Sequence, residues 1–205
     1  MSFPTYAVST ELDAVNQILS SVGQAPVTTL DLQNPEVGIV LNTLREVSRM
    51  VQAEGWVFNV ERSYELTPDA TTKEITYPFN ALQIDTNRDE HLASYDPVRR
   101  NGKLYDRLNH TYQWQEPIKA DIIWYFDFTD LPPAFQAYIT ARAARMCATK
   151  MVGDKEINEL LKEQEVYTRA AALEYECQQG DYSMFGFRDG EDFYSSYQPF
   201  KALAR

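Results

Sequence analysis

The sequence predicts an α+β fold: an antiparallel helical bundle of two N-terminal and two C-terminal helices, with an inserted, mostly antiparallel β module. Apolar residues recur at helical spacing near both ends of the chain, and in the middle their period changes to two. The end of the chain follows neither period. We therefore expect a discontinuous helical domain of residues 1–55 and 132–180, an inserted β domain of residues 56–131 and an irregular aromatic tail of residues 181–205.

Composition narrows the class of protein. A chain of 205 residues, 44% hydrophobic and 24% charged, is long enough to bury a real core in one large or two small domains. Its 19 basic residues against 30 acidic ones argue against a surface that wraps nucleic acid, because each phosphate contact needs a cation. No apolar run approaches the ~20 residues of a membrane span. The N-terminus lacks the basic start and apolar core of a signal peptide.

Two helices are expected before residue 56. In "TELDAVNQILSSVG", Thr10 can cap the N-terminus together with Asp13, and Gly23 supplies a C-terminal stop. In the second helix, Asn34 is the expected cap and Pro35 the first helical residue. Both segments carry an apolar stripe, so each is expected to bury one face.

Four to six strands are expected between the two helical regions, mostly antiparallel because the connections are short. The segments that read as strands are "WVFNVERSYEL", "EITYPF", "ALQID", "PVRRNGKLYDR" and "IKADIIWYFDF". Pro78 limits the second segment, because proline cannot donate to a β ladder. Asn101-Gly102 lies between two strand-like arms, which is the strongest short-range signal for a hairpin.

Two further helices are expected, Pro133–Val152 and Asp154 to about Gln179. The first has a ridge of small residues that allows a neighbouring helix to approach closely: Ala137, Ala141, Ala144 and Ala148. The expected buried side of the second consists of Ile157, Leu160, Leu161, Tyr167, Ala171 and Tyr175. The two cysteines, Cys147 and Cys177, are interpreted as buried helical thiols, with a disulfide as the alternative.

Motifs of enzyme chemistry are scarce, and no cofactor or metal is expected. His91 and His110 are the only histidines, and no zinc, phosphate-loop or dinucleotide motif is present. Carboxylates that could serve a glycosidase occur near strand ends, as Asp127 with Asp130 and Glu61 with Glu65. The sugar-stacking candidates are Trp56, Trp114 and Trp124, for which packing in a core is the commoner role. A polysaccharide hydrolase remains an alternative.

One basic cluster and one aromatic cluster are candidate interaction sites. The basic cluster consists of Arg99, Arg100, Lys103 and Arg107. It is either a solvated hairpin tip or an electrostatic contact with an acidic partner, including a neighbouring copy of this acidic chain. The aromatic cluster consists of Tyr182, Phe185, Phe187, Phe193, Tyr194, Tyr197 and Phe200. These rings either dock on another protein chain or fold back over their own bundle.

The order of motifs resembles the tail tubular protein A family, the head–tail adaptors or gatekeepers of short-tailed bacteriophages of the autographivirus type. The matching segments are "ELDAVNQILSSVGQAPVTTLD", "GWVFNVE", "GKLYDR", "DLPPAFQAYITARAARMC" and "EYECQQGDYSMF". The resemblance extends from about Thr10 to Gly190. The combination of "LDAVNQIL" and "APV" with "GWVFN" about thirty residues later carries most of its specificity.

The resemblance implies a structural role in the virion tail for a protein made in the host bacterial cytoplasm. Members form a twelve-subunit ring below the portal, continue the DNA channel and hold the nozzle protein, tail tubular protein B. Tail fibres attach near the junction of adaptor and nozzle. No catalytic residues carry over from the family. The resemblance makes the aromatic tail a candidate contact with a neighbouring subunit or with the portal.

Two further expectations concern such a ring. An acidic lumen would let DNA pass without sequence-specific binding, because it repels phosphate. The helical bundle is expected to face the portal and the β module the tail. The alternatives to an adaptor are the polysaccharide hydrolase and a binding or regulatory module unrelated to virions.

Overall fold

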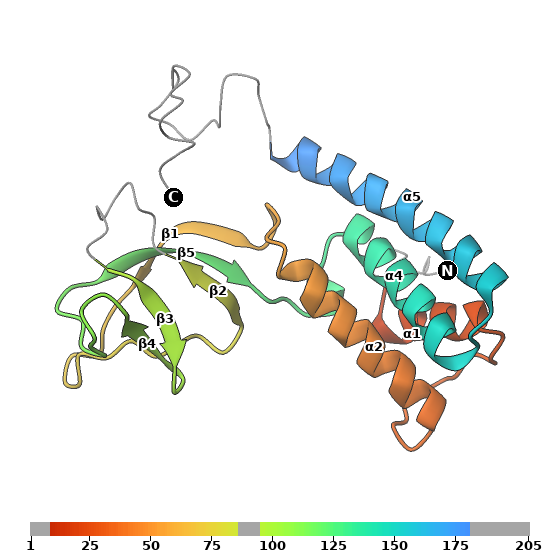
Figure 1. Ribbon diagram of the computed structural model, residues 1–205, viewed down its shortest axis with the longest axis horizontal. Helices are drawn as coiled ribbons and strands as arrows, with labels where there is room; N and C mark the ends of the chain where they lie inside the picture. Colours follow the sequence, from red (N-terminus) through yellow and green to blue (C-terminus); the bar gives the residue numbers. More distant parts are fainter. Residues whose placement is uncertain (1–8, 86–94, 181–205) are drawn as a thin grey trace, which may run out of the picture.

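The computed structural model describes residues 9–85 and 95–180. The chain forms two bodies, a helical bundle and a β module, side by side along its longest axis (Figure 1). The β strands lie in sequence between the second and third long helices, so the predicted α+β fold is confirmed. The expected positions His91, Tyr182, Phe185, Phe187, Phe193, Tyr194, Tyr197 and Phe200 lie outside the described residues.

The N-terminal helices begin where their caps predict. In helix α1 (Glu11–Ser21), the Thr10 hydroxyl accepts the Asp13 N–H at 3.2 Å, and the Asp13 carboxylate accepts the Thr10 N–H at 3.0 Å. Helix α2 (Pro35–Gln52) starts at a proline, with the Asn34 side chain accepting the N–H of its second residue at 3.1 Å. Side-chain capping satisfies amide groups that lack helical partners, so each start is locally encoded.

Helix α4 (Pro133–Met151) is the central helix of the bundle and packs against α1, α2 and helix α5 (Lys155–Gln179). Its interior positions are buried on several sides, including Phe135, Tyr138 and Ile139. The predicted ridge of small residues is buried at Ala141, Ala144 and Ala148 and exposed at Ala137. These small side chains allow the neighbouring helices to approach α4 closely.

The β module contains two antiparallel sheets. Strand β5 (Ile118–Trp124) pairs with β1 (Val60–Leu66) on one side and with β2 (Ala81–Asp85) on the other. Strands β3 (Pro97–Arg100) and β4 (Lys103–Asp106) form a separate hairpin. The module has its own hydrophobic core, distinct from that of the bundle, which includes Leu104, Trp114, Ile118, Ala120 and Ile122.

Two predicted strand segments differ in the structure. Residues 56–59 form a turn, because the Asn59 side chain accepts the Trp56 N–H at 2.8 Å. Trp56 and Phe58 therefore pack on Phe135 in the bundle, with ring centroids at 4.9 and 4.7 Å. The segment "EITYPF" makes isolated bridges at Glu74 and Thr76 in place of a ladder.

The predicted buried side of α5 is partly wrong. Leu161 is buried, but Leu160 and Tyr167 are 68% and 77% exposed. The buried stripe runs instead through Leu161, Ala172 and Glu176. Cys147 is buried as predicted, whereas Cys177 is exposed, and both thiols are free. The error arises because α5 packs mainly on one helix, which covers a narrower face than the apolar residues of α5 occupy.

Candidate assembly surfaces

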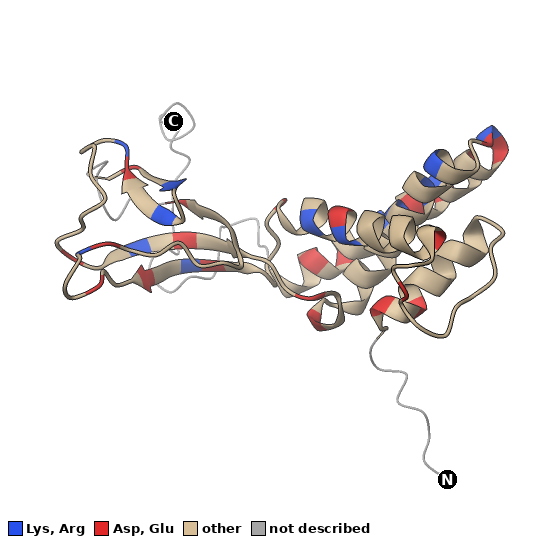
Figure 2. Cartoon of the chain, turned by 90° about the horizontal axis from the view of Figure 1, so that it is seen from below, with Lys and Arg blue, Asp and Glu red and all other residues tan. Residues whose placement is uncertain are grey.

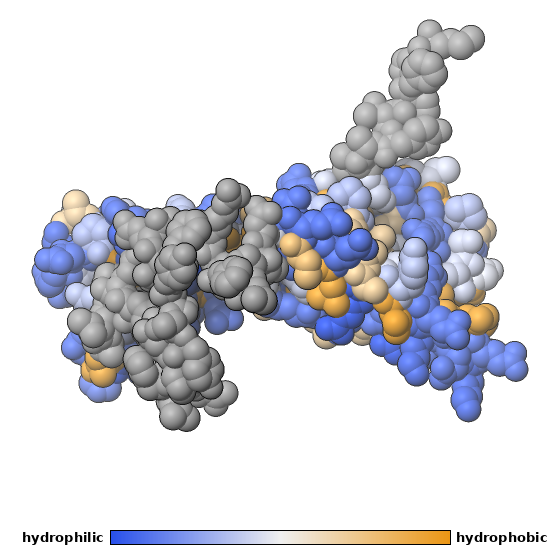
Figure 3. Space-filling view, turned by 90° about the horizontal axis from the view of Figure 1, so that it is seen from above, coloured by the Kyte–Doolittle hydropathy of each residue, from blue (hydrophilic) through white to orange (hydrophobic). Residues whose placement is uncertain are grey.

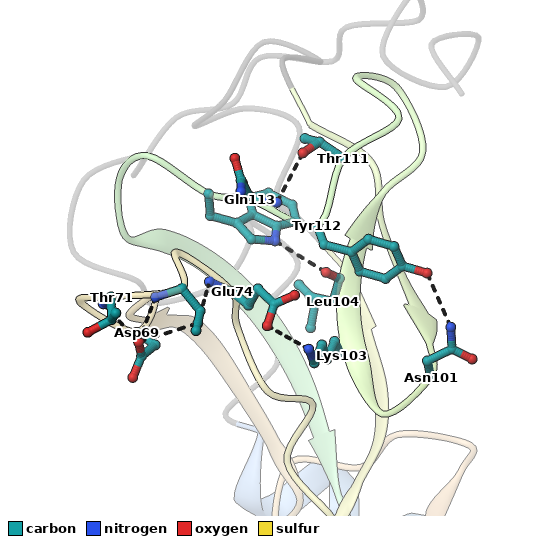
Figure 4. Close-up of polar contacts among 11 residues, drawn as sticks. Asp69, Thr71, Glu74, Asn101, Lys103, Leu104, Thr111, Tyr112 and Gln113 are labelled. Carbon is teal, nitrogen blue, oxygen red and sulfur yellow. Dashed lines mark hydrogen bonds and ion pairs between the residues drawn. The ribbon is translucent and has the colours of Figure 1, made fainter.

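The β3–β4 hairpin turns at Asn101-Gly102, as the sequence predicts. Both residues adopt positive φ angles, 50° and 71°, as two-residue hairpin turns require. The Asn101 amide donates to the Tyr112 hydroxyl at 3.4 Å (Figure 4). This hydrogen bond joins the turn of the hairpin to Tyr112, in the segment that follows β4.

Arg99 and Arg100 lie on aromatic rings. The Arg99 guanidinium is 4.9 Å from the centroid of Tyr77, and that of Arg100 is 4.2 Å from the centroid of Tyr105. Arg99 and the electron-rich face of Tyr77 attract each other, but the ring carries no charge that would neutralise the cation. Both arginines are exposed. They are positive groups held in place and accessible to a partner.

Lys103 and Arg107 are paired with carboxylates of the same chain. The Lys103 ammonium lies 2.5 Å from Glu74 (Figure 4), and the Arg107 guanidinium lies 2.5 Å from Asp96. Basic and acidic residues accordingly lie close together over the β module in Figure 2. Of the four residues in the predicted basic cluster, Lys103 and Arg107 belong to these ion pairs, and Arg99 and Arg100 do not. That they meet an acidic partner stays a prediction.

Asp106, at the end of β4, organises the loop below the hairpin. It is 1% exposed, and its carboxylate accepts the N–H groups of Asp96 at 3.1 Å and Leu108 at 2.9 Å, and the Asn109 amide at 2.6 Å. Burial alone would raise the pKa of Asp106, but the hydrogen bonds from Asn109, Asp96 and Leu108 outweigh it and lower the pKa. The charged carboxylate is therefore the form that holds this loop.

Two buried amides join the bundle to the β module. Gln52, the last residue of α2, donates to the Phe126 carbonyl at 3.0 Å and accepts the Phe126 N–H at 2.8 Å. Asn59 donates to the carbonyls of Gln52 at 2.8 Å and Trp124 at 2.9 Å. The chain passes between the bundle and the β module twice. These hydrogen bonds join the two connecting segments to each other and to the end of α2.

Helix α5 also reaches this junction. The Glu176 carboxylate is 9% exposed and accepts the Val57 N–H through both oxygens, at 2.9 and 3.1 Å. The sequence reasoning missed Glu176, Gln52 and Asn59 as structural residues. No sequence signal pointed to Glu176, because the predicted buried side of α5 did not include it. The partners through which they join the two bodies, Phe126, Trp124 and Val57, are distant in the sequence, and no local pattern reveals them.

The tryptophans considered for sugar stacking make contacts within the chain. Trp56 and Trp114 are buried at 7% and 2% exposure, inside the two cores. The Trp124 indole donates to Glu61 at 2.8 Å. This distribution gives no open platform of tryptophans. Within residues 9–85 and 95–180, no group of three or more histidine, cysteine or acidic residues could hold a metal ion.

A pocket of about 380 Å³ lies beside the junction. In it, the Arg45 guanidinium makes two hydrogen bonds with Glu11, at 3.1 and 2.9 Å, and this pairing raises the Arg45 pKa. The lining residues are Glu11, Arg45, Tyr125, Asp127, Phe128 and Thr129. No helix in the described part of the chain is both long and apolar enough to span a membrane.

The two bodies are joined by buried hydrogen bonds, and exposed cations and apolar side chains lie on their surfaces, which suits a structural assembly protein. Comparison with known proteins agrees. The sequence profile described as tail tubular protein matches residues 12–182. Over 168 residues the chain is 28% identical to tail tubular protein A of Klebsiella phage KP34, covering 80% of this chain and 86% of that protein.

The chain therefore belongs to the tail tubular protein family, as the sequence motifs predict. It is a structural protein of the phage virion and is located in the tail.

Proposed function

We propose that the chain forms the adaptor ring between the portal and the tail nozzle of a short-tailed phage. The observation that carries this proposal is membership of the tail tubular protein family over residues 12–182. About twelve copies close the ring, which holds the nozzle protein, tail tubular protein B, and supports tail-fibre attachment. The role is structural, with no catalytic step.

A closed ring needs two different complementary faces on each copy, because its contacts are head-to-tail. The hairpin offers one such face, with Arg99 and Arg100 exposed and positive. The chain as a whole carries a net charge of −11, so a neighbouring copy presents acidic surface. Charge complementarity of this kind selects the register of assembly more than it adds affinity.

The aromatic residues of segment 181–205 dock on a neighbouring adaptor subunit or on the portal. Large rigid rings are enriched at protein interfaces because they bury much apolar area at a small entropy cost. The seven tyrosines and phenylalanines between Tyr182 and Phe200 supply such rings.

The bundle and the β module act as two domains with separate attachments. Each has its own hydrophobic core, which supports this division. The bundle faces the portal, and the β module faces the nozzle and fibres. Phage DNA passes through the ring without sequence-specific binding, because an acidic lumen repels its phosphates. Genome retention and ejection then depend on the closed channel.

The proposal is tested with a phage that lacks this chain. DNA-containing heads without nozzle or fibres should accumulate under the electron microscope, and supplying the full chain from a plasmid should restore tailed particles. Normal tails in its absence would contradict an adaptor role. Loss of polysaccharide turnover with tails intact would favour the hydrolase alternative.

A further inference from the structure

The outer side of α5 carries apolar residues that no element of the described chain covers. Val166, Ala170, Leu173 and Cys177 follow one another at spacings of four, three and four residues. This spacing places them in one stripe, on the side of the helix away from the buried residues Leu161 and Ala172. Leu160 and Tyr167 flank the stripe. We call these six residues the outer face of α5.

The outer face is unusually exposed for its composition. Leu160, Val166 and Tyr167 are 68%, 63% and 77% exposed, and Leu173 is 43% exposed. Figure 3 shows apolar residues gathered among hydrophilic ones on the bundle, on the side of the molecule where α5 lies. Single exposed apolar residues are ordinary, but a patch of this kind on one helix marks an interaction surface.

We infer that the outer face of α5 receives the aromatic C-terminal segment, residues 181–205, of the adjacent copy in the ring. This inference rests on the proposed adaptor ring. The small side chain of Ala170 lies between the larger Val166 and Leu173 in the stripe, and a phenylalanine or tyrosine ring of the segment would pack there. From Val166 to Cys177 the stripe itself contains no charged residue, which suits apolar rings, and Glu163 and Glu174 border it.

Segment 181–205 is long enough to reach the outer face of α5 on a neighbouring copy. Helix α5 has 25 residues and is therefore about 37 Å long. Residues 181–205, when extended, span at most about 80 Å. The segment can thus cross a gap between two copies of roughly the length of α5 and still follow the outer face of the neighbour from end to end.

The proposed ring supplies the receiver. Its contacts are head-to-tail, so each copy gives one segment and receives another on a different face. Each segment begins after Gly180, at the C-terminal end of α5.

The inference is tested by photo-crosslinking in full-length protein assembled on its portal ring. Phe187 is replaced by a photoreactive phenylalanine analogue, and isotopically heavy and light copies are mixed before assembly. We expect heavy–light crosslinks to peptides of residues 160–177. Val166→Ser with Leu173→Ser should reduce these crosslinks several-fold, whereas Gln164→Ser, at an exposed polar position of the same helix, should leave them unchanged.

Cys177 supplies a second readout that needs no added probe. Its labelling by a maleimide should be several-fold slower in the ring than in unassembled protein, and faster again in rings carrying Phe185→Ser and Phe187→Ser. Cys147 is the internal control, because burial raises the pKa of its thiol and keeps it unreactive in both states.

Three outcomes would overturn the inference. Crosslinks to α5 only between segments of equal isotope would place the segment on its own chain. Rings that form with Cys177 fully reactive and without crosslinks to α5 would leave the adaptor role standing and refute the docking. Absence of any ring on the portal would refute both.

Discussion

At the scale of single residues, the exposed hairpin depends on a buried carboxylate. Asp106 accepts donors from both sides of the hairpin base, and its pKa is lowered by those hydrogen bonds in spite of burial. A buried acceptor with this many donors stabilises strongly only while it stays an acceptor. The orientation of the hairpin, and so of Arg99 and Arg100, is tied to its ionisation.

We expect Asp106→Asn to destabilise the protein by about 1–3 kcal/mol, because the new amide group would face N–H donors. The measurement is the free energy of unfolding in urea at neutral pH. Glu116→Gln is the matched control, since it makes the same chemical change at an exposed site of the β module and should cost less than about 0.5 kcal/mol. Equal effects of the two substitutions would contradict the role given to Asp106.

The pH dependence has a definite sign. The folded pKa of Asp106 lies below its unfolded value of about 3.9, so the folded state binds fewer protons. Its stabilisation is present above the unfolded pKa and is lost as pH falls through the folded pKa. The difference in stability between the wild type and Asp106→Asn should thus be constant from neutral pH to about 5 and shrink in stronger acid. A difference that grows in acid would contradict this assignment.

Substituting Arg99 and Arg100 should affect assembly differently from substituting Lys103 and Arg107. Arg99→Gln with Arg100→Gln should weaken ring assembly and reduce its dependence on salt, because within residues 9–85 and 95–180 these exposed charges contact aromatic rings and form none of the ion pairs described for Lys103 and Arg107. Lys103→Gln with Arg107→Gln should change assembly less and cost stability by at most about 1 kcal/mol per pair. Assembly measured by light scattering at two salt concentrations distinguishes the pairs, and equal losses would argue against the assignment.

At the scale of elements, helix starts and the hairpin were predictable, because their signals are local. Thr10 with Asp13, Asn34 with Pro35 and Asn101-Gly102 act within a few residues. The turn at Trp56 and the exposed side of α5 were not predictable in the same way. The Asn59–Trp56 hydrogen bond of the turn is local, but the position of the Trp56 ring depends on the distant Phe135. The exposed side of α5 depends mainly on α4.

The junction between the bundle and the β module should depend on Gln52. We expect Gln52→Ala to cost about 1–3 kcal/mol, because it leaves the N–H and C=O of Phe126 without their partner in a partly buried region. Gln24→Ala, at an exposed position of the bundle, is the control and should stay within about 0.5 kcal/mol. Hydrogen exchange at residues 124–128 should also accelerate in Gln52→Ala. Unchanged exchange would show that the junction does not need this amide.

The same junction contains a glycine whose conformation and surroundings can be tested separately. Gly55 has φ +76°, and a Cβ there would lie 3.0 Å from the Ile123 side chain; Gly153, after α4, has φ +71° and open space around it. Both Gly→Ala substitutions should cost about 1–2 kcal/mol from backbone strain, with the larger loss at Gly55. Thermal unfolding of the two variants measures the difference, and a larger loss at Gly153 would contradict the packing described here.

At the scale of the whole molecule, the fold and the function were predictable to different depths. Periodicity gave an α+β bundle with a β insertion, and the motifs gave the tail tubular protein family, which the comparison confirms. The surfaces were harder, because exposure on α5 and the intramolecular partners of Lys103 and Arg107 follow from tertiary packing. The division into domains and the docking of segment 181–205 remain predictions.

The central claim is that this chain is the adaptor that assembles on the portal. Mass photometry of the purified protein, alone and mixed with the portal ring of the same phage near physiological salt, tests it most directly. The account predicts a gain in mass of about twelve copies per portal ring. Portal rings that gain no mass at any ratio of the two proteins would contradict it.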